Sequence, residues 1–215
     1  MIPIHMLASN NAAIDDNTKI LQDIHLKTKN ISVYRREIAS LEKGLDQAIK
    51  LPIEYRAGGT VEEIDFSLRT YFTNMLPKHV DFMEDILHLL ELFKQITRVG
   101  SFRISLVKVS SNMCPRFHAD NNQLRMLCTY YGPGTLWLPD HVGDRKAYRT
   151  GQSNQKILSD ESLVRQAGTG DVVILKGALY PRTTPVLHRS PSIEENGGER
   201  ILLSIDPNEP IHFPI

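Results

Sequence analysis

Apolar residues in the first half of the chain recur every three or four positions, which is the spacing of one face of an α-helix. This pattern predicts a helix over residues 38–49, which ends before Pro52 because proline cannot continue a regular helix. Thr60 followed by Glu63 has the form of a capping box and predicts that a second helix begins there. The widest apolar stripe predicts a third helix from residue 79 to about 97, packed on a hydrophobic core.

The pattern changes after Gly100, where short β-rich runs alternate with turn-forming residues. Clusters of Gly, Pro, Asn and Asp separate these runs, as at residues 132–134 and 195–198. Many short strands with turns between them predict an antiparallel barrel or jelly roll. The predicted strands are residues 102–109, 124–131, 135–138, 171–176 and 200–206.

The two halves of the chain therefore predict different kinds of structure. Residues 1–99 are expected to form a mainly helical region and residues 100–215 the barrel, which together give an α+β fold. The first 30 residues are polar and weakly patterned, apart from one helical turn expected around residues 20–24. No linker-like stretch separates the halves, so we expect the helices to buttress the barrel within one compact domain.

Charge and composition narrow the classes of partner. The 215 residues include 25 basic and 25 acidic side chains, so the formal net charge is zero and argues against nucleic acid or an anionic membrane as partner. No stretch approaches the roughly 20 apolar residues that span a bilayer, and the first residues lack the basic start of a secretory signal. Two cysteines are too few for a disulfide scaffold. These features predict a cytoplasmic protein.

Candidate chemistry gathers in the segment from Cys114 to Thr135. It contains His118 and Asp120, whose side chains project from the same face if the segment is extended. His188 follows a later apolar run and can supply a second imidazole. Two imidazoles and one carboxylate leave open coordination positions, which suits non-haem Fe(II) and also catalytic zinc. We therefore predict a metal site made by these two histidines and one aspartate.

Other polar side chains near this segment leave two interpretations each. Arg125 lies on an otherwise apolar predicted strand and needs a partner if it points inward, as does Arg103. The partner is either the carboxylate of a substrate or cosubstrate, or an acid at the edge of the barrel. Cys114 and Cys128 are either small hydrophobic side chains without a function or, with the two candidate histidines, the ligands of a closed zinc site.

The order of these residues resembles that of the Fe(II)- and 2-oxoglutarate-dependent oxygenase superfamily. The resemblance implies a double-stranded β-helix, a cupin-like jelly roll, in which His118, Asp120 and His188 bind iron. It also implies that Arg200 binds the far carboxylate of 2-oxoglutarate beside the hydroxyl of Ser204, a geometry that suits a planar guanidinium. The implied activity is hydroxylation of a C–H bond. The polar loop between the second histidine and the arginine is slightly longer than the superfamily pattern, and Arg182 and Arg189 are other basic residues nearby.

The phrases CPRFHAD, LRMLCTYYGPGTLWL and HRSP more closely resemble the domain-of-unknown-function family 1826. This resemblance implies a GTPase of zinc homeostasis as partner. A non-enzymatic zinc-binding accessory protein is therefore the alternative to an oxygenase, and a metal-free binding barrel is a third interpretation. The expected substrate is a small molecule or a protein. Its identity is not readable from the sequence, because loops determine substrate choice in such barrels.

Overall fold

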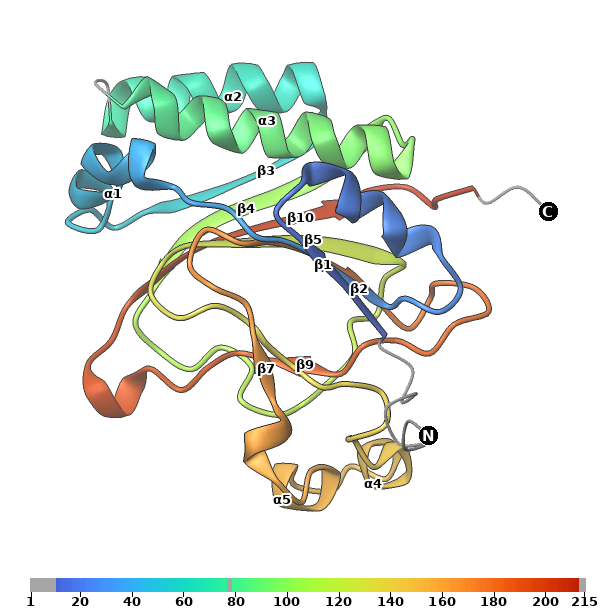
Figure 1. Ribbon diagram of the computed structural model, residues 1–215. Coiled ribbons are helices and arrows are strands. Elements are labelled where there is room, and N and C mark those ends of the chain that lie inside the picture. Colours follow the sequence, from blue (N-terminus) through green and yellow to red (C-terminus); the bar gives the residue numbers. More distant parts are fainter. Residues whose placement is uncertain (1–10, 77–78, 213–215) are drawn as a thin grey trace.

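The computed structural model describes residues 11–76 and 79–212. Helices cover one face of a large sheet, and a small sheet lies beyond its other face (Figure 1). The strands are β1 (Ala12–Asp15), β2 (Ile31–Tyr34), β3 (Glu54–Thr60), β4 (Ser101–Val109), β5 (Leu124–Tyr131), β6 (Leu136–Trp137), β7 (Arg165–Gln166), β8 (Val172–Lys176), β9 (His188–Arg189) and β10 (Arg200–Pro207). The helices are α1 (Glu42–Ala48), α2 (Val61–Met75), α3 (Val80–Thr97), α4 (Arg145–Arg149) and α5 (Asn154–Ile157), with 3-10 turns at Thr18–His25, Ala39–Leu41, Glu161–Leu163 and Glu194–Asn196.

The large sheet has the strand order β1-β2-β8-β5-β10-β4-β3, and the small sheet the order β7-β6-β9. Neighbouring strands are antiparallel except β1 and β2. An antiparallel bridge between His118 and His188 extends the small sheet beyond β9. From β4 to β10 the chain thus passes repeatedly between two facing sheets, which is consistent with a jelly roll.

The two sheets do not form a closed barrel, and this corrects the barrel expected from the sequence. Within residues 11–76 and 79–212 no strand pairing joins the large sheet to the small one. The strands of the small sheet are only two residues long, so they are too short to continue the ladder around a barrel. The α+β class is confirmed, and the structure opens as a cleft between the sheets.

The region before residue 100 contributes three strands to the large sheet, in addition to the expected helices. β1 and β2 extend one edge next to β8, and β3 forms the other edge next to β4. The expected division into a helical region 1–99 and a barrel region 100–215 therefore does not follow the sheet. One sheet and one main hydrophobic core connect both regions.

Two of the three predicted helices, α2 and α3, begin within one residue of the expected position. The Thr60 hydroxyl accepts a hydrogen bond from the backbone of Glu63, whose carboxylate accepts one from the backbone of Thr60, so the capping box is confirmed. The segment expected as one helix over 38–49 is instead a 3-10 turn followed by α1. No helix in the described part of the chain is long and apolar enough to cross a membrane.

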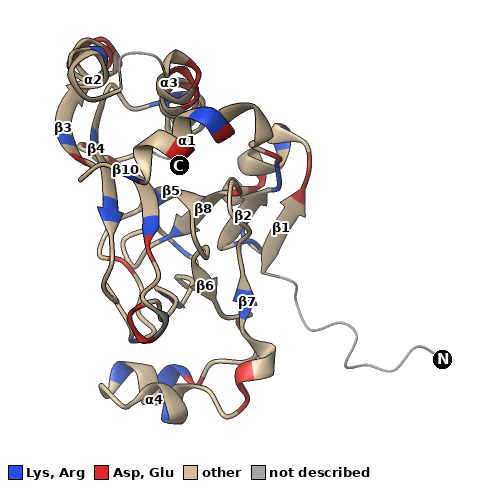
Figure 2. Cartoon of the chain, turned by 90° about the vertical axis from the view of Figure 1, so that its left-hand side faces the viewer, with Lys and Arg blue, Asp and Glu red and all other residues tan. Residues whose placement is uncertain are grey.

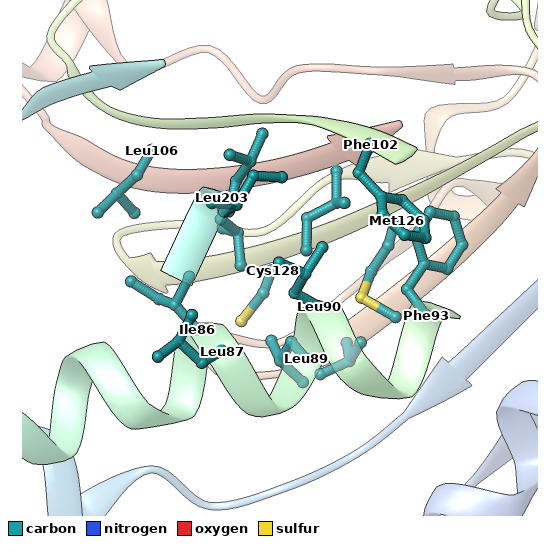
Figure 3. Close-up of a cluster of buried hydrophobic side chains, with 14 of the residues drawn as sticks. Ile86, Leu87, Leu89, Leu90, Phe93, Phe102, Leu106, Met126, Cys128 and Leu203 are labelled. Atoms are coloured by element: carbon teal, nitrogen blue, oxygen red, sulfur yellow. The ribbon is translucent and has the colours of Figure 1, made fainter. Parts of the chain in front are cut away.

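The apolar stripe of α3 forms the centre of the core. Its side chains pack against the outward face of the large sheet, where Met126 and Cys128 of β5 and Leu203 of β10 lie (Figure 3). Phe93 of α3 lies beside Phe102, with ring centroids 5.9 Å apart. This face of the sheet is filled by the helices, so most polar side chains of the same strands point to the opposite, inner face.

A buried polar network also joins α3 to the sheet. Arg36 donates to both carboxylate oxygens of Asp85 on α3, at 2.6 and 2.8 Å. The hydroxyl of Tyr130 on β5 donates to the same carboxylate at 2.6 Å. The carboxylate thus has charged and neutral partners that offset the cost of its burial.

Candidate metal centre

The two candidate histidines are held together by the backbone of the small sheet. The amide of His118 donates to the carbonyl of His188 at 3.0 Å, and the amide of His188 donates back at 2.9 Å. This pairing places the two imidazole rings side by side, with centroids 4.4 Å apart. The sequence separates these residues by 70 positions, so strand pairing brings the site together.

Asp120 completes a group whose ligand atoms all lie within 4.8 Å of one another. One carboxylate oxygen, Oδ1, lies 3.7 Å from Nε2 of His118, and the other, Oδ2, lies 3.4 Å from Nε2 of His188. Oδ2 is buried without a hydrogen-bond partner in the described part of the chain. A buried carboxylate oxygen that faces two imidazole nitrogens fits a bound divalent cation, because the cation would satisfy all three groups.

The hydrogen-bond geometry of His118 and the lowered pKa of His188 both suit metal binding. Nδ1 of His118 lies 2.9 Å from the carbonyl of Arg116, so a proton on Nδ1 leaves Nε2 free as a ligand. Burial lowers the pKa of His188 to about 3, and the charges of His118 and Arg125 act in the same direction. His188 is therefore neutral near pH 7, and neutral imidazole is the form that binds metals.

Arg125 contacts the candidate ligand Asp120. It donates to Oδ1 of Asp120 at 2.8 Å and makes a two-point ion pair with Asp206 at 2.9 and 3.0 Å. Burial opposes its charge, but the hydrogen bond and charge of Asp206 raise the pKa of Arg125 above its ordinary value. Of the two interpretations from the sequence, the structure shows the ion pair, whereas a contact to a cofactor stays a prediction.

Sequence reasoning did not single out Asp206, although it holds Arg125 in place. Asp206 lies on β10 two residues after Ser204, so alternation along the strand places both side chains on the inner face. This periodicity was the available signal. The ion pairs of Arg125 with Asp206 and with Asp120 hold Oδ1 of Asp120 in place. Its other oxygen, Oδ2, is left facing His188.

A cavity of about 290 Å³ opens beside the two histidines, between the sheets. Ser204 lines this cavity, as the resemblance implies for a residue beside a cosubstrate. Cys114 lines it too and is exposed. The cavity is thus polar at the metal centre, with the apolar side chains of Val107, Leu127 and Leu202 on its inner wall.

Arg200 lies at the beginning of β10, on the same inner face as Ser204, and is 1% exposed. Its Nη2 donates to the hydroxyl of Thr129 at 3.1 Å, while its Nε has no hydrogen-bond partner in the described part of the chain. No carboxylate of the described residues forms an ion pair with it. Burial lowers the pKa of Arg200 to about 10, which still leaves the guanidinium charged near pH 7. A buried positive charge without an acid is costly and fits an anionic ligand.

The two cysteines lie on different sides of the sheet, which excludes the closed zinc site that would use both. Cys128 is buried on the outer face of β5 against the helices, 3.5 Å from Nη2 of Arg36. Burial raises the pKa of Cys128 to about 12, so the thiol stays protonated at neutral pH. Because successive side chains of a strand alternate between faces, Cys128 points away from the cavity that Cys114 lines.

Comparison with solved structures finds similar chains at low sequence identity, and one of them has a TM-score above 0.5. A dioxygenase for auxin oxidation from Arabidopsis thaliana, solved as a binary complex with 2-oxoglutarate, is 12% identical, covers 93% of this chain and 92% of its own, and gives a TM-score of 0.51. A prolyl-4-hydroxylase from Pseudomonas putida is 9% identical, with 88% and 97% covered and a TM-score of 0.48. HygX from Streptomyces hygroscopicus, with iron bound, is 10% identical, with 83% and 82% covered and a TM-score of 0.44.

No curated protein matches the chain by sequence. The family described as "Protein of unknown function (DUF1826)" matches residues 15–206. That range contains the candidate triad, Arg200 and every strand from β2 to β9. Because the match covers most of the 215 residues, the chain belongs to the DUF1826 family.

Proposed function

We propose that this protein is an Fe(II)- and 2-oxoglutarate-dependent oxygenase that hydroxylates a substrate held in the cleft between the two sheets. His118, Asp120 and His188 would hold the iron. The donor set supports this assignment, because two imidazoles and a carboxylate on one side of an ion leave positions open for other ligands. The dioxygenase of similar fold is a complex with 2-oxoglutarate, which favours the same cosubstrate here.

The observation that carries the proposal is the buried, acid-free guanidinium of Arg200. A protein retains such a charge only where something offsets its desolvation, and an anionic cosubstrate would do so. The hydroxyl of Thr129 already orients Nη2, and Nε is left for a second contact to a carboxylate. Ser204 lies on the same face of β10, closer to the triad, and can donate to the same ligand.

When bound, iron and 2-oxoglutarate supply the oxidising chemistry that side chains lack. The residues of the chain supply position and environment. Arg125 holds one oxygen of Asp120, so that the other oxygen faces His188. Leu127 and Leu202 line the inner wall of the cavity, where apolar side chains limit the access of water.

An anaerobic titration of metal-free protein with Fe(II), followed by 2-oxoglutarate, tests this function. Chelation of 2-oxoglutarate to iron gives a visible charge-transfer band, which we expect for the wild type. Arg200→Met should keep Fe(II) binding and weaken the 2-oxoglutarate-dependent band at least tenfold in affinity. His118→Ala should lose both Fe(II) binding and the charge-transfer band. Arg149 is exposed on helix α4, so Arg149→Gln should behave like the wild type.

A wild type without the band, together with tight zinc binding in parallel samples, would contradict the oxygenase. It would favour the role of a zinc-binding accessory protein, whose donor set could be the same three residues. A zinc-homeostasis GTPase as partner stays a prediction. Pull-down of that GTPase by the zinc-loaded protein, and not by the His118→Ala variant, is the measurement that would support it.

A further inference from the structure

The inner face of the large sheet continues past the metal centre to the edge strand β3. The 290 Å³ cavity at the triad adjoins a second cavity of about 620 Å³ over β3, β4 and β10. Arg56, Ser105, Ser204 and Asp206 line both cavities. The two cavities thus form one continuous groove, which we call the inner-face groove.

Strand register gives the floor of this groove two rows of side chains. In the first row, Arg56 on β3 lies opposite Ser105 on β4, which lies opposite Ser204 on β10. Residues paired in neighbouring strands point to the same face of a sheet. The row therefore runs from a guanidinium at the edge of the sheet, over two hydroxyls, to Leu127 on β5 beside the triad.

The second row runs parallel to the first. Arg103 on β4 lies opposite Asp206 on β10, and Asp206 is bound by Arg125 of β5. Arg125 in turn contacts Asp120 of the triad. On β3 the row ends at Gly58, which has no side chain to block the groove next to Arg103.

The charges along these rows do not balance. The single acid on the floor, Asp206, is already paired at two points with Arg125. Arg103 forms no ion pair with any described residue, and Arg56 faces only Glu54 at 3.5 Å, with both side chains largely exposed. Exposed pairs of this kind contribute little. Figure 2 shows the Lys and Arg segments on the strands at this edge of the sheet. Together the rows hold three guanidinium groups, of Arg56, Arg103 and Arg125, and two carboxylates, of Asp206 and Asp120, so the groove carries one guanidinium group in excess although the whole chain is neutral.

The hydroxyls of Ser105 and Ser204 add donors and acceptors to the same floor. Neither hydroxyl forms a hydrogen bond with another residue in the described part of the chain, and both line the cavities. Because these hydroxyls lie between the metal centre and a guanidinium, they can form hydrogen bonds with the middle part of a polar ligand. A planar guanidinium binds phosphate and carboxylate oxygens with two parallel hydrogen bonds.

We infer that the substrate is an elongated polar molecule that carries a phosphate or carboxylate group, which Arg56 and Arg103 bind while the reacting carbon lies at the triad. This inference rests on the proposed function for the reacting end only. Adjacent strands lie about 4.8 Å apart. Arg103 and Arg56 therefore lie on strands about 10 Å and about 14 Å from β5, so the substrate must span a distance on the order of 10 Å.

Titration of the full chain with inorganic phosphate, and separately with acetate, tests the anion site without metal. The side-chain Nε–H signals of Arg56 and Arg103 are followed by nitrogen-15 NMR, with Arg149 on α4 as the matched exposed control. We expect Arg56 and Arg103 to shift with one shared Kd that is at least tenfold tighter than that of Arg149. Arg56→Gln should weaken binding at Arg103 at least tenfold and leave Arg149 unchanged. Tighter binding of phosphate than of acetate would indicate a phosphorylated substrate. Tighter binding of acetate would indicate a substrate with a carboxylate group.

Shifts at Arg56 and Arg103 no larger than at Arg149 for both anions would overturn the inference. A second measurement tests the length. With Mn(II) bound, the relaxation of phosphorus-31 in bound phosphate should place the anion at a distance on the order of 10 Å from the metal, well outside direct coordination. A metal–phosphorus distance short enough for direct coordination of phosphate to Mn(II) would overturn the placement of the anion at Arg56 and Arg103. Failure of Mn(II) to bind would contradict the proposed function alone, because the metal-free titration decides the anion site independently.

Discussion

Replacing Arg200 by Met should stabilise the protein without ligands and strongly weaken its response to 2-oxoglutarate. The side chain is 1% exposed and its Nε has no partner, so its burial costs about 1–3 kcal/mol. The substitution removes this cost and also the hydrogen bond to Thr129, which contributes about 1 kcal/mol. Methionine keeps an unbranched apolar chain in the same space. The net gain is about 1 kcal/mol, or about 2–4 °C in Tm for a chain of this size.

The order of stability should reverse when the cosubstrate is present. A ligand at a concentration of 100 times its Kd stabilises the folded state by about 2.7 kcal/mol. The wild type with Fe(II) should gain this amount from 2-oxoglutarate, whereas Arg200→Met should gain little because the carboxylate loses its cationic partner. The wild type then becomes the more stable protein by about 1–2 kcal/mol.

Anaerobic urea unfolding with Fe(II), with and without 2-oxoglutarate, measures this crossover. Arg149→Met serves as the control, because it removes an exposed arginine from α4, outside both sheets. Two results would refute the reasoning. One is an Arg200→Met protein that is about 2 kcal/mol less stable than the wild type without ligands, which would mean that the guanidinium is well solvated or paired. The other is equal stabilisation of both proteins by 2-oxoglutarate.

Three further predictions concern other contacts. Asp85→Asn should lower the free energy of unfolding by about 3 kcal/mol in urea, because Arg36 would keep its charge and lose its acid; an unchanged midpoint would contradict this. A thiol reagent should modify Cys114 in the folded protein and Cys128 only after unfolding, so two fast thiols would show that the core opens. Arg125→Gln should weaken metal binding 10–100-fold in competition with a chelator, and unchanged affinity would remove its positioning role.

Local patterns predicted the elements that are stabilised locally. The Thr60–Glu63 capping box and the apolar stripe of α3 each lie within one stretch of sequence, and both predictions are confirmed. The strand β3 was not predicted, because its sequence EYRAGGT contains two glycines and no apolar alternation. It forms because every residue from Glu54 to Thr60 pairs with a residue of β4, about 50 positions later in the chain. Such pairing depends on the whole sheet and leaves no local signal.

In the candidate site too, contacts within one segment were predictable from the sequence, and contacts that depend on strand register were not. His118 and Asp120 were predictable because two residues of one extended segment share a face, and the structure places them together with His188. The pair of Arg125 with Asp206 depends on the register of β5 against β10, which is interrupted by a bulge that leaves Tyr130 unpaired with β10. A register shift by one residue would turn Arg125 to the other face. A single sequence does not fix that register.

The strand β10 explains how the chain can carry a charged site beside a tightly packed core. Its residues Ile201, Leu203 and Ile205 pack into the main core under the helices. The alternate residues, among them Arg200 and Ser204, face the opposite side, where the cavity lies. Because the strand has a period of two, substitutions on the inner face remove no contact of the helical core. Loss of activity in inner-face variants should therefore occur without loss of cooperative unfolding, and a variant such as Leu203→Ala should show the reverse, with about 2–5 kcal/mol lost.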